Sequence, residues 1–316
     1  MESLTPAERY AAAKAKTQAK QKFPISNSFF ETLDFELDDF QIKGCHSIES
    51  GRGVLVAAPT GAGKTIVGEF AAYLALIQNR KCFYTTPIKA LSNQKYQEFV
   101  ERFGETRVGL LTGDNSINTE AQIVVMTTEV LRNMLYTGST TLTNLGFVVM
   151  DEVHYLADKF RGAVWEEVLI HLMESVQVVS LSATVSNAEE FGEWLQAVRG
   201  DTEVIVSENR PVPLYQHVLI GHRLLDLFNE DGSINQALFR SEKDAMRRIR
   251  GSRFQPTDGS KLTRPEVIEK LQSVQMLPVI TFIFSRQGCD SAVKQCLAAN
   301  IRLTNTQERD EIRQTA

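Results

Sequence analysis

The sequence has few cysteines and no apolar run that is long enough to cross a membrane. Its four cysteines, Cys45, Cys82, Cys289 and Cys296, show neither C-x-x-C spacing nor an accompanying group of histidines. This pattern argues against a zinc site and favours reduced thiols over disulfides. A membrane span needs about 20 apolar residues, and the N-terminus lacks the apolar core of a signal peptide. We therefore predict a cytoplasmic protein that does not bind a membrane.

An excess of positive charge is also lacking. The formal net charge of −5 argues against indiscriminate binding of nucleic acid, although a local groove can be basic in an acidic protein. With 316 residues and 43% hydrophobic content, the chain can bury a sizeable core and is expected to form more than one domain. The first 22 residues are expected to form a helical tail.

The most informative stretch joins an apolar run over residues 54–58, typical of a buried strand, to helical spacing over 66–78. Between them lies the turn Thr60-Gly61-Ala62-Gly63-Lys64-Thr65. Glycine tolerates the backbone angles that let successive N–H groups converge on a phosphate at a helix N-terminus. Lys64 would reach the β and γ phosphates of ATP, and Thr65 would offer its hydroxyl to Mg²⁺. The alternative is a glycine-rich turn that binds nothing.

A second candidate for nucleotide binding is Gln41, in the first turn of a helix that Asp38 is expected to cap. The Gln41 amide can complete this cap, or it can donate to and accept from one adenine edge. Its place about twenty residues before the phosphate turn favours adenine. Phe35 would then stack on the base, and the alternative is a core phenylalanine.

Buried strands alternate with helices from residue 81 onwards, which predicts a parallel sheet with helices on both faces. One strand, over 147–150, ends in Asp151-Glu152-Val153-His154. Such sheets bind ligands at the carboxyl ends of their strands. Asp151 is therefore expected to hold Mg²⁺, and Glu152 to orient and deprotonate the attacking water. The alternative is an acidic strand end that only caps the next helix.

Several later segments carry weaker signals. The strand over 176–181 ends in Ser182-Ala183-Thr184, whose hydroxyls could link the nucleotide edge to a second lobe. A strand-like stretch over 214–228 and a basic run over 240–253 suggest a connector, although the basic run could also track a phosphate backbone. Helical patterns over 265–275 and 287–298 flank an apolar run over 279–284, and we expect this run to be a buried strand of a second α/β unit.

Taken in order, these motifs resemble the DEVH-box, Ski-type helicases of helicase superfamily two. The bacterial HelY-like members look most similar, because residues 151–165 read DEVHYLADKFRGAVW as one block. The resemblance implies a RecA-like ATP-binding domain over residues 23–210, a connector over 211–262 and the start of a second, truncated RecA-like domain over 263–316. The α/β fold would thus consist of a parallel sheet flanked by helices, followed by an incomplete second lobe.

The resemblance also assigns roles that the residues alone do not reveal. It makes Phe35 and Gln41 an adenine-reading motif, and His154, Ser182 and Thr184 a link between hydrolysis and movement. It further implies contacts to a nucleic-acid backbone, a task suited to amides and hydroxyls that need no base reading. These contacts would come from Thr86, Pro87, Thr112, Gly113, Asp114, Thr127, Thr128 and Glu129.

One departure from the family pattern limits the expected activity. Such helicases carry a later Q-x-x-G-R-x-G-R segment whose arginines meet the γ-phosphate, and none is present here. Loss of an arginine finger costs about a thousandfold or more in phosphoryl transfer. We therefore expect an N-terminal portion of an ATP-dependent RNA helicase with impaired turnover, with RNA preferred over DNA and partners in RNA processing or degradation. A related DNA helicase and a nucleotide- and strand-binding module without turnover remain the alternatives.

Overall fold

The computed structural model describes residues 21–159, 161–183, 188–243 and 262–315. The chain divides into two compact units, Met1–Val212 and Pro213–Ala316. Residues 1–20 of the expected helical tail and the expected coupling residue Thr184 lie outside the described residues.

Unit 1 is built on an eight-stranded sheet in the order β4-β3-β5-β2-β6-β7-β1-β8. The strands are β1 (Gly53–Ala57), β2 (Lys81–Thr86), β3 (Val108–Leu111), β4 (Ser116–Ile117), β5 (Ile123–Thr127), β6 (Leu145–Met150), β7 (Gln177–Ser182) and β8 (Thr202–Val206). All neighbouring strands pair in parallel except β3 and β4, which are antiparallel. The predicted parallel α/β sheet is thus confirmed for this unit. Strand β4 was not predicted from the sequence, because it is two residues long and exposed and therefore carries no apolar signal.

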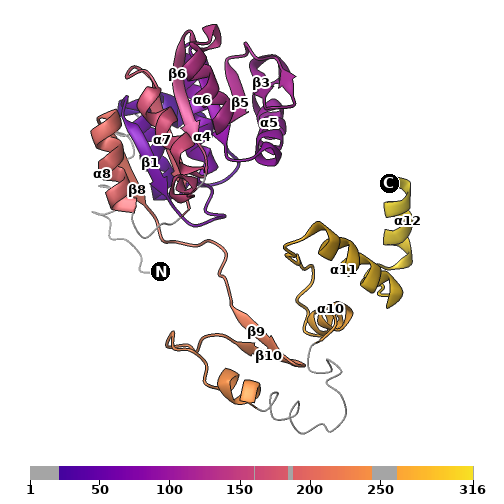
Figure 1. Cartoon of the computed structure of the whole chain (residues 1–316). Helices are drawn as coiled ribbons and strands as arrows, with labels where there is room; N and C mark the ends of the chain where they lie inside the picture. The colour runs from indigo at the N-terminus through magenta and orange to yellow at the C-terminus, as the bar shows by residue number, and fades with distance from the viewer. Residues whose placement is uncertain (1–20, 160, 184–187, 244–261, 316) are drawn as a thin grey trace, which may run out of the picture. The chain divides into compact units, whose positions relative to one another are not determined.

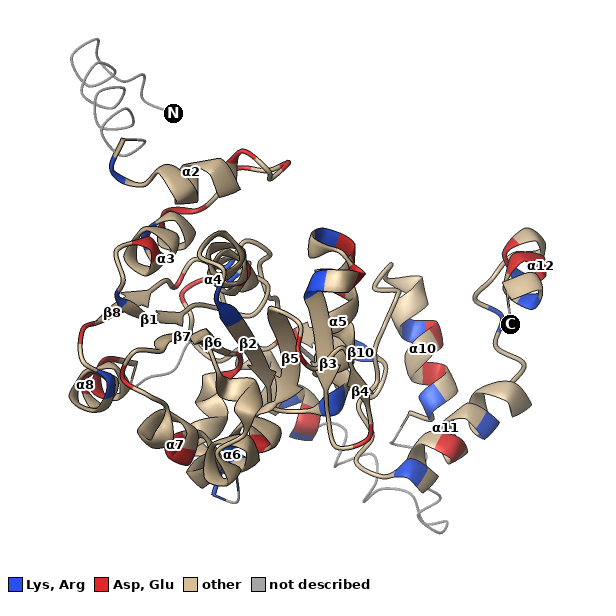
Figure 2. Ribbon diagram, turned by 90° about the horizontal axis from the view of Figure 1, so that it is seen from above, with Lys and Arg blue, Asp and Glu red and all other residues tan. Residues whose placement is uncertain are grey.

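Helices cover both faces of this sheet (Figure 1). The helices are α2 (Pro24–Phe30), α3 (Asp39–Glu49), α4 (Thr65–Ile77), α5 (Lys89–Phe103), α6 (Thr128–Thr137), α7 (Gly162–His171) and α8 (Ala188–Arg199), with short 3-10 helices η1 (Glu105–Arg107), η2 (Thr140–Leu142) and η3 (Val153–Ala157). In Figure 2, α3 and α4 lie above the strands, and α6 and α7 lie below them. The sheet is therefore buried on both sides, as the continuous apolar strands predict.

Alternate residues of each central strand enter separate cores on the two faces. Val54 and Val56 of β1 pack with α3 and α4, whereas Leu55 faces the core that contains Trp165 of α7. Tyr84 of β2 belongs to the first core and Phe83 to the second. The position of a residue along its strand thus decides on which face of the sheet its side chain lies, and this also holds at the carboxyl ends of the strands.

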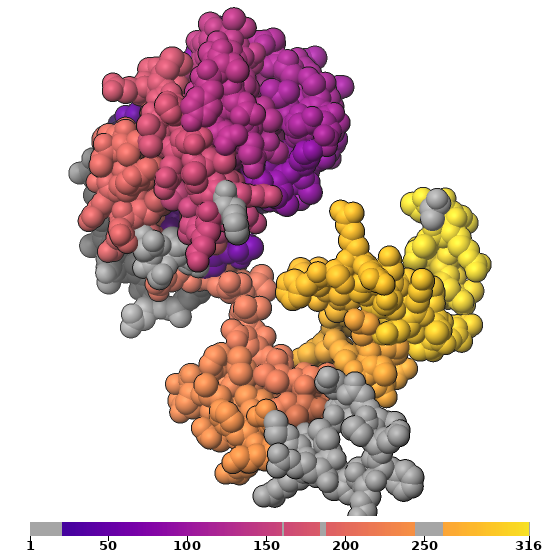
Figure 3. All heavy atoms as spheres, in the orientation of Figure 1, coloured from indigo at the N-terminus to yellow at the C-terminus, as the bar shows by residue number. Residues whose placement is uncertain are grey.

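Unit 2 contains a hairpin of β9 (His217–Ile220) and β10 (Arg223–Asp226), which resolves the strand-like stretch predicted over 214–228. It also contains the helices α10 (Arg264–Ser273), α11 (Arg286–Ala298) and α12 (Thr306–Thr315). None of these three helices buries a residue within the described part of the unit, and Figure 3 draws their atoms in gold and yellow.

The buried strand predicted over residues 279–284 is wrong. These residues form no strand, and the side chains of Ile280 and Phe282 are 81% and 83% exposed. An extended segment becomes a strand only when a neighbour completes its hydrogen bonds. In the described part of unit 2, the paired strands are β9 and β10, and they pair with each other. An apolar run identified the segment, but it could not supply the partner.

Candidate nucleotide and magnesium site

The turn between β1 and α4 has the backbone that a phosphate cradle requires. Gly61 and Gly63 have φ values of 83° and 79°, in the region that favours glycine. A Cβ at Gly61 would meet no atom within 4 Å, so open space lies above the turn. The Lys64 ammonium donates to the carbonyl oxygens of Ala58 at 2.9 Å and Pro59 at 3.1 Å. These contacts hold its positive charge against the turn at the N-terminus of α4.

The charge of Lys64 lies within electrostatic reach of the two carboxylates after β6. Burial lowers the pKa of Lys64, and the nearby Glu152 and Asp151 act in the opposite direction. Burial likewise raises the pKa values of both carboxyl groups, and the charge of Asp151 raises that of Glu152 further. The cradle and the acidic pair therefore lie close enough to form one candidate site, although they are about ninety residues apart in the chain.

Asp151 is held on both of its carboxylate oxygens. Oδ1 accepts the N–H of Glu152 at 2.9 Å, and Oδ2 accepts the hydroxyl of Tyr84 at 2.8 Å. The backbone N–H of Asp151 donates to the carbonyl of Thr85 at 2.9 Å. Glu152 has a φ of 54°, which is uncommon for a residue with a side chain and often marks a functional site.

The residues at this site suit Mg²⁺. The ion prefers oxygen ligands and is commonly bound by one or two carboxylates together with substrate phosphates. The Asp151 carboxylate and the Thr65 hydroxyl are such donors, at the end of β6 and the start of α4 respectively. No group of three or more His, Cys, Asp or Glu side chains that could hold a metal occurs in the described ranges.

Gln41 connects α3 to the cradle. Its Oε1 accepts the N–H of Asp38 at 2.9 Å, and its Nε2 donates to the carbonyl of Gly63 at 2.9 Å. The capping role that the sequence left open is therefore present in the structure. Adenine recognition stays a prediction, and Phe35 is 54% exposed, so it is not a core phenylalanine.

His154 lies between the acidic pair and the end of β7. Its Nδ1 is 3.2 Å from Oε2 of Glu152 and 3.4 Å from the backbone nitrogen of Ala183. The neighbouring Ser182 hydroxyl is buried and has no hydrogen-bond partner among the described residues. His154 thus contacts the residue that follows Ser182, whereas Thr184 lies outside the described residues.

The candidate strand-binding residues gather at the ends of β2, β3 and β5, which neighbour one another in the sheet. Several of their side chains are already engaged: Thr86 Oγ1 bonds to the Ile88 carbonyl at 3.0 Å and to the Ser92 hydroxyl at 2.7 Å. Thr112 Oγ1 accepts the N–H of Asn115 at 3.2 Å, and Asp114 pairs with Lys89. Thr127 and Thr128 are buried. Any contact to a nucleic-acid strand here would rely more on backbone groups than on these hydroxyls.

Three residues that the structure places around these motifs were not predicted from the sequence. Tyr84 bonds to Asp151, Lys89 pairs with Asp114, and Arg161 donates to the carbonyl of Pro87 at 3.4 Å. A polar hydroxyl within the apolar strand over 82–86 was the available signal for Tyr84. The partners of Lys89 and Arg161 come from other segments, so no local pattern identifies them.

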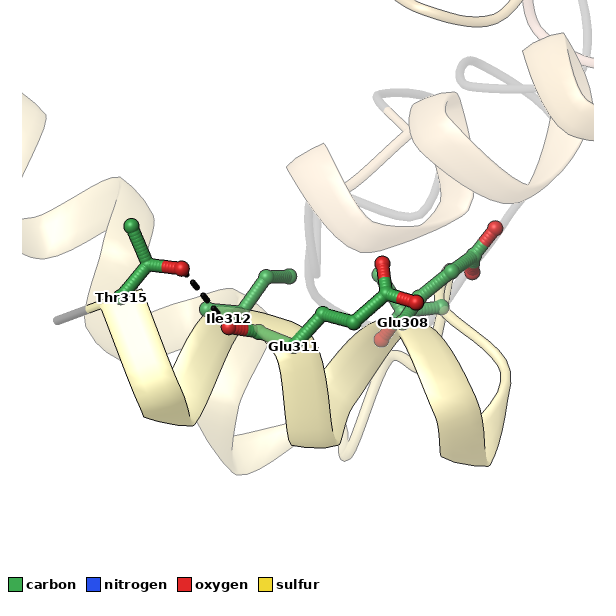
Figure 4. Close-up of a pocket in the computed structure, with 5 residues that line it drawn as sticks. Glu308, Glu311, Ile312 and Thr315 are labelled. Atoms are coloured by element: carbon green, nitrogen blue, oxygen red, sulfur yellow. Dashed lines mark hydrogen bonds between the residues drawn. The ribbon is translucent and has the colours of Figure 1, made fainter.

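A hollow on α12 lies outside this site (Figure 4). Glu308 and Glu311 line it together with Ile312 and Thr315, and the Thr315 hydroxyl donates to the Glu311 carbonyl at 2.9 Å. Two carboxylates repel a phosphate, so this hollow does not suit a nucleotide. Within the described residues, no helix is long and apolar enough to span a membrane.

Comparison with known proteins agrees with the geometry of unit 1. Residues 38–191 match the family described as DEAD/DEAH box helicase, and this part of the chain is a DEAD/DEAH box helicase domain. The chain is 57% identical to the probable helicase HelY of Mycobacterium leprae over 90% of its own length and 33% of the relative's. The resemblance to Ski-type, HelY-like helicases is therefore confirmed.

More distant relatives carry RNA or antiviral helicase names. The chain is 40% identical to the chloroplastic ATP-dependent RNA helicase DExH15 of Arabidopsis thaliana, over 88% of this chain and 27% of that protein. It is 35% identical to the antiviral helicase SKI2 of Saccharomyces cerevisiae, over 88% and 26%. The chain spans about a third or less of these curated relatives.

Proposed function

We propose that this chain is the ATP-binding part of an ATP-dependent RNA helicase motor. The observation that carries the proposal is the electrostatic proximity of Lys64 to Asp151 and Glu152 at the carboxyl edge of the sheet. The candidate strand contacts occupy the neighbouring half of the same sheet, on β2, β5 and β3. Nucleotide and nucleic acid would thus bind along one edge.

In this proposal, different residues of the chain bind ATP, hold Mg²⁺ and activate the attacking water. Lys64 and the backbone of Gly61 to Thr65 bind the phosphates of ATP, and Gln41 with Phe35 reads the adenine. Asp151 and Thr65 hold Mg²⁺, which when bound neutralises charge on the phosphates. Glu152 orients a water and accepts its proton as the water oxygen bonds to the γ-phosphorus and ADP leaves.

The names of the relatives support RNA as the nucleic acid. DExH15 of Arabidopsis thaliana and mtr4 of Schizosaccharomyces pombe are both named ATP-dependent RNA helicases. We therefore propose RNA over DNA as the substrate, and proteins of RNA processing or degradation as partners. The proposed compartment is the cytoplasm. An unwinding assay with matched RNA and DNA duplexes tests the choice of RNA over DNA, with a protein that contains this chain and a complete second lobe. Opening of the DNA duplex alone would contradict RNA as the substrate.

The experiment that tests the ATP site compares Glu152→Gln with Glu190→Gln, an exposed glutamate on α8. We expect the chain to bind a fluorescent ATP analogue in the presence of Mg²⁺, and its ATPase rate to be low but raised by single-stranded RNA. Glu152→Gln should keep binding and lose hydrolysis, whereas Glu190→Gln should change neither. An unaltered ATPase rate in Glu152→Gln would contradict the catalytic role of this carboxylate.

A second candidate function is a nucleotide- and strand-binding module without turnover. The absence of a Q-x-x-G-R-x-G-R segment from the given sequence favours it for this chain. It predicts strand binding that responds to the ATP analogue, with no ATPase at any RNA concentration. RNA-stimulated hydrolysis by residues 1–316 would remove this candidate.

A further inference from the structure

Tyr84 is a buried phenol whose hydroxyl reaches the candidate magnesium ligand. The residue lies on β2 with no exposed surface, and its hydroxyl donates to Oδ2 of Asp151 at 2.8 Å. A buried tyrosine hydroxyl is usually hydrogen-bonded, because an unsatisfied one loses its hydration without compensation. Here the acceptor is the carboxylate that the proposed function gives to Mg²⁺.

The ring of Tyr84 is fixed by its neighbours on α5. The Phe99 ring meets it edge-on, with centroids 5.1 Å apart and an interplanar angle of 82°. The Lys95 ammonium lies 5.7 Å from the centroid of the Tyr84 ring. These contacts leave the phenol little freedom to turn, so its hydroxyl is presented to Asp151 from a fixed direction.

The strands that carry the two residues are also joined beside the contact. Thr85 pairs with Met150 in the parallel register of β2 and β6. The Thr85 hydroxyl donates to the Val149 carbonyl at 3.2 Å, and its own carbonyl accepts the N–H of Asp151 at 2.9 Å. The separation of Tyr84 and Asp151 is therefore set by the sheet.

The two hydrogen bonds to Asp151 together define the orientation of its carboxylate. Glu152 N–H holds Oδ1 and Tyr84 holds Oδ2, and each oxygen retains a second lone pair. Without the Tyr84 hydroxyl, Oδ2 would lose the one side-chain donor recorded for it among the described residues. The carboxylate could then turn about its Cβ–Cγ bond, away from the direction in which it faces a ligand.

We propose that Tyr84 is a positioning residue for Mg²⁺, which acts by holding the Asp151 carboxylate through its hydroxyl. The proposal rests on the proposed function, because it takes Asp151 as a ligand of nucleotide-bound Mg²⁺. Hydrogen-bond partners of metal ligands commonly contribute 10- to 100-fold in metal affinity. Tyr84 is thus expected to influence the Mg²⁺ requirement of nucleotide binding without touching the nucleotide.

The test is Tyr84→Phe, which removes the hydroxyl and keeps the ring against Phe99. Binding of a fluorescent, non-hydrolysable ATP analogue is measured over a series of Mg²⁺ concentrations and again with EDTA. We expect the Mg²⁺ midpoint to rise about 10-fold, while affinity in EDTA stays within about twofold. Tyr73→Phe is the matched control, since the Tyr73 hydroxyl meets Ser28 at 3.3 Å on an exposed part of α4.

A second variant separates positioning from packing. Phe99→Leu loosens the ring contact but keeps the Tyr84 hydroxyl, so it should lower Tm and raise the Mg²⁺ midpoint less than Tyr84→Phe does. An unchanged Mg²⁺ midpoint in Tyr84→Phe would overturn this inference and leave the proposed function in place. A shift of the midpoint in Phe99→Leu as large as that in Tyr84→Phe would do the same. If the unmodified chain binds no nucleotide with Mg²⁺, the proposed function fails and takes this inference with it.

Discussion

His154 Nδ1 lies 3.2 Å from Oε2 of Glu152, while the backbone N–H of Ala183 approaches the same nitrogen at 3.4 Å. A protonated Nδ1 donates to the carboxylate, whereas an unprotonated Nδ1 accepts from the amide. The nitrogen cannot do both at once. His154 therefore connects the proposed catalytic base to the strand end that carries Ser182, through a contact that has two alternative forms.

Replacement of His154 by alanine should weaken the coupling between the candidate nucleotide site and the candidate nucleic-acid contacts. We expect His154→Ala to bind the ATP analogue as the unmodified chain does. RNA stimulation of ATPase should fall by about fivefold or more, in the usual range of coupling energies. His171→Ala is the control, because the His171 ring on α7 packs on the Tyr136 ring, with centroids 5.2 Å apart. Equal stimulation in His154→Ala and the control would count against a coupling role.

Gln41 variants separate the capping role from adenine recognition. Gln41→Ala should destabilise unit 1 by about 0.5–1.5 kcal/mol, because the half-buried Gly63 carbonyl loses one of its two donors. Gln41→Glu keeps an acceptor for Asp38 and loses the donor to Gly63. If the amide also reads adenine, both variants should lose affinity for ATP while changing affinity for GTP less.

The control for this pair is Gln94→Ala, an exposed amide on α5 whose partner is Glu98 at 2.9 Å. Nucleotide titrations and thermal unfolding measure the two effects separately. A lower Tm with an unchanged preference for ATP over GTP would leave Gln41 with its structural role and contradict adenine recognition.

Lys64 should contribute directly to phosphate binding. A hydrogen bond to a charged group contributes about 1.5–3 kcal/mol, so Lys64→Ala should weaken binding of the ATP analogue by about 10- to 100-fold. Lys294→Ala on α11 changes an exposed lysine in unit 2 and should have no effect. Isothermal titration or fluorescence measures both variants, and an unaltered Kd in Lys64→Ala would argue against a cradle.

Glu203 should make the stability of unit 1 depend on acid pH. Hydrogen bonds from Lys43 and Arg52 lower the pKa of this carboxyl. A group whose pKa is lower in the folded state contributes stability above its unfolded pKa, about 4.3 for glutamate, and loses it as pH falls through the folded value. Glu203→Gln should therefore lower stability by about 0.5–1 kcal/mol near pH 7.

This difference between Glu203→Gln and the unmodified chain should shrink as pH falls below about 4. Thermal unfolding from about pH 3 to pH 7 measures it, with the exposed Glu193→Gln on α8 as the control. A Tm difference that stays constant over this range would contradict a contribution from the Glu203 charge.

The local parts of the fold and site were predictable because their causes lie within a few residues. The cap of Asp38 and Gln41 spans three residues, and the positive φ values of Gly61 and Gly63 follow from the turn that must join a strand to a helix. The strands expected over 54–58 and 176–181 were also assigned to within one residue, as β1 and β7. The run over 279–284 was not, since an apolar pattern does not state which strand will pair with it.

The sequence by itself determined the helicase resemblance, the parallel sheet of unit 1 and the candidate residues for phosphate and Mg²⁺. Tertiary structure decided which strands are neighbours, and thereby joined Tyr84 to Asp151 across 67 residues and Gln41 to Gly63 across 22. Spacing and side-chain type report local backbone preference. A hydrogen bond between distant segments depends on sheet order and register, which are set by the packing of the whole domain.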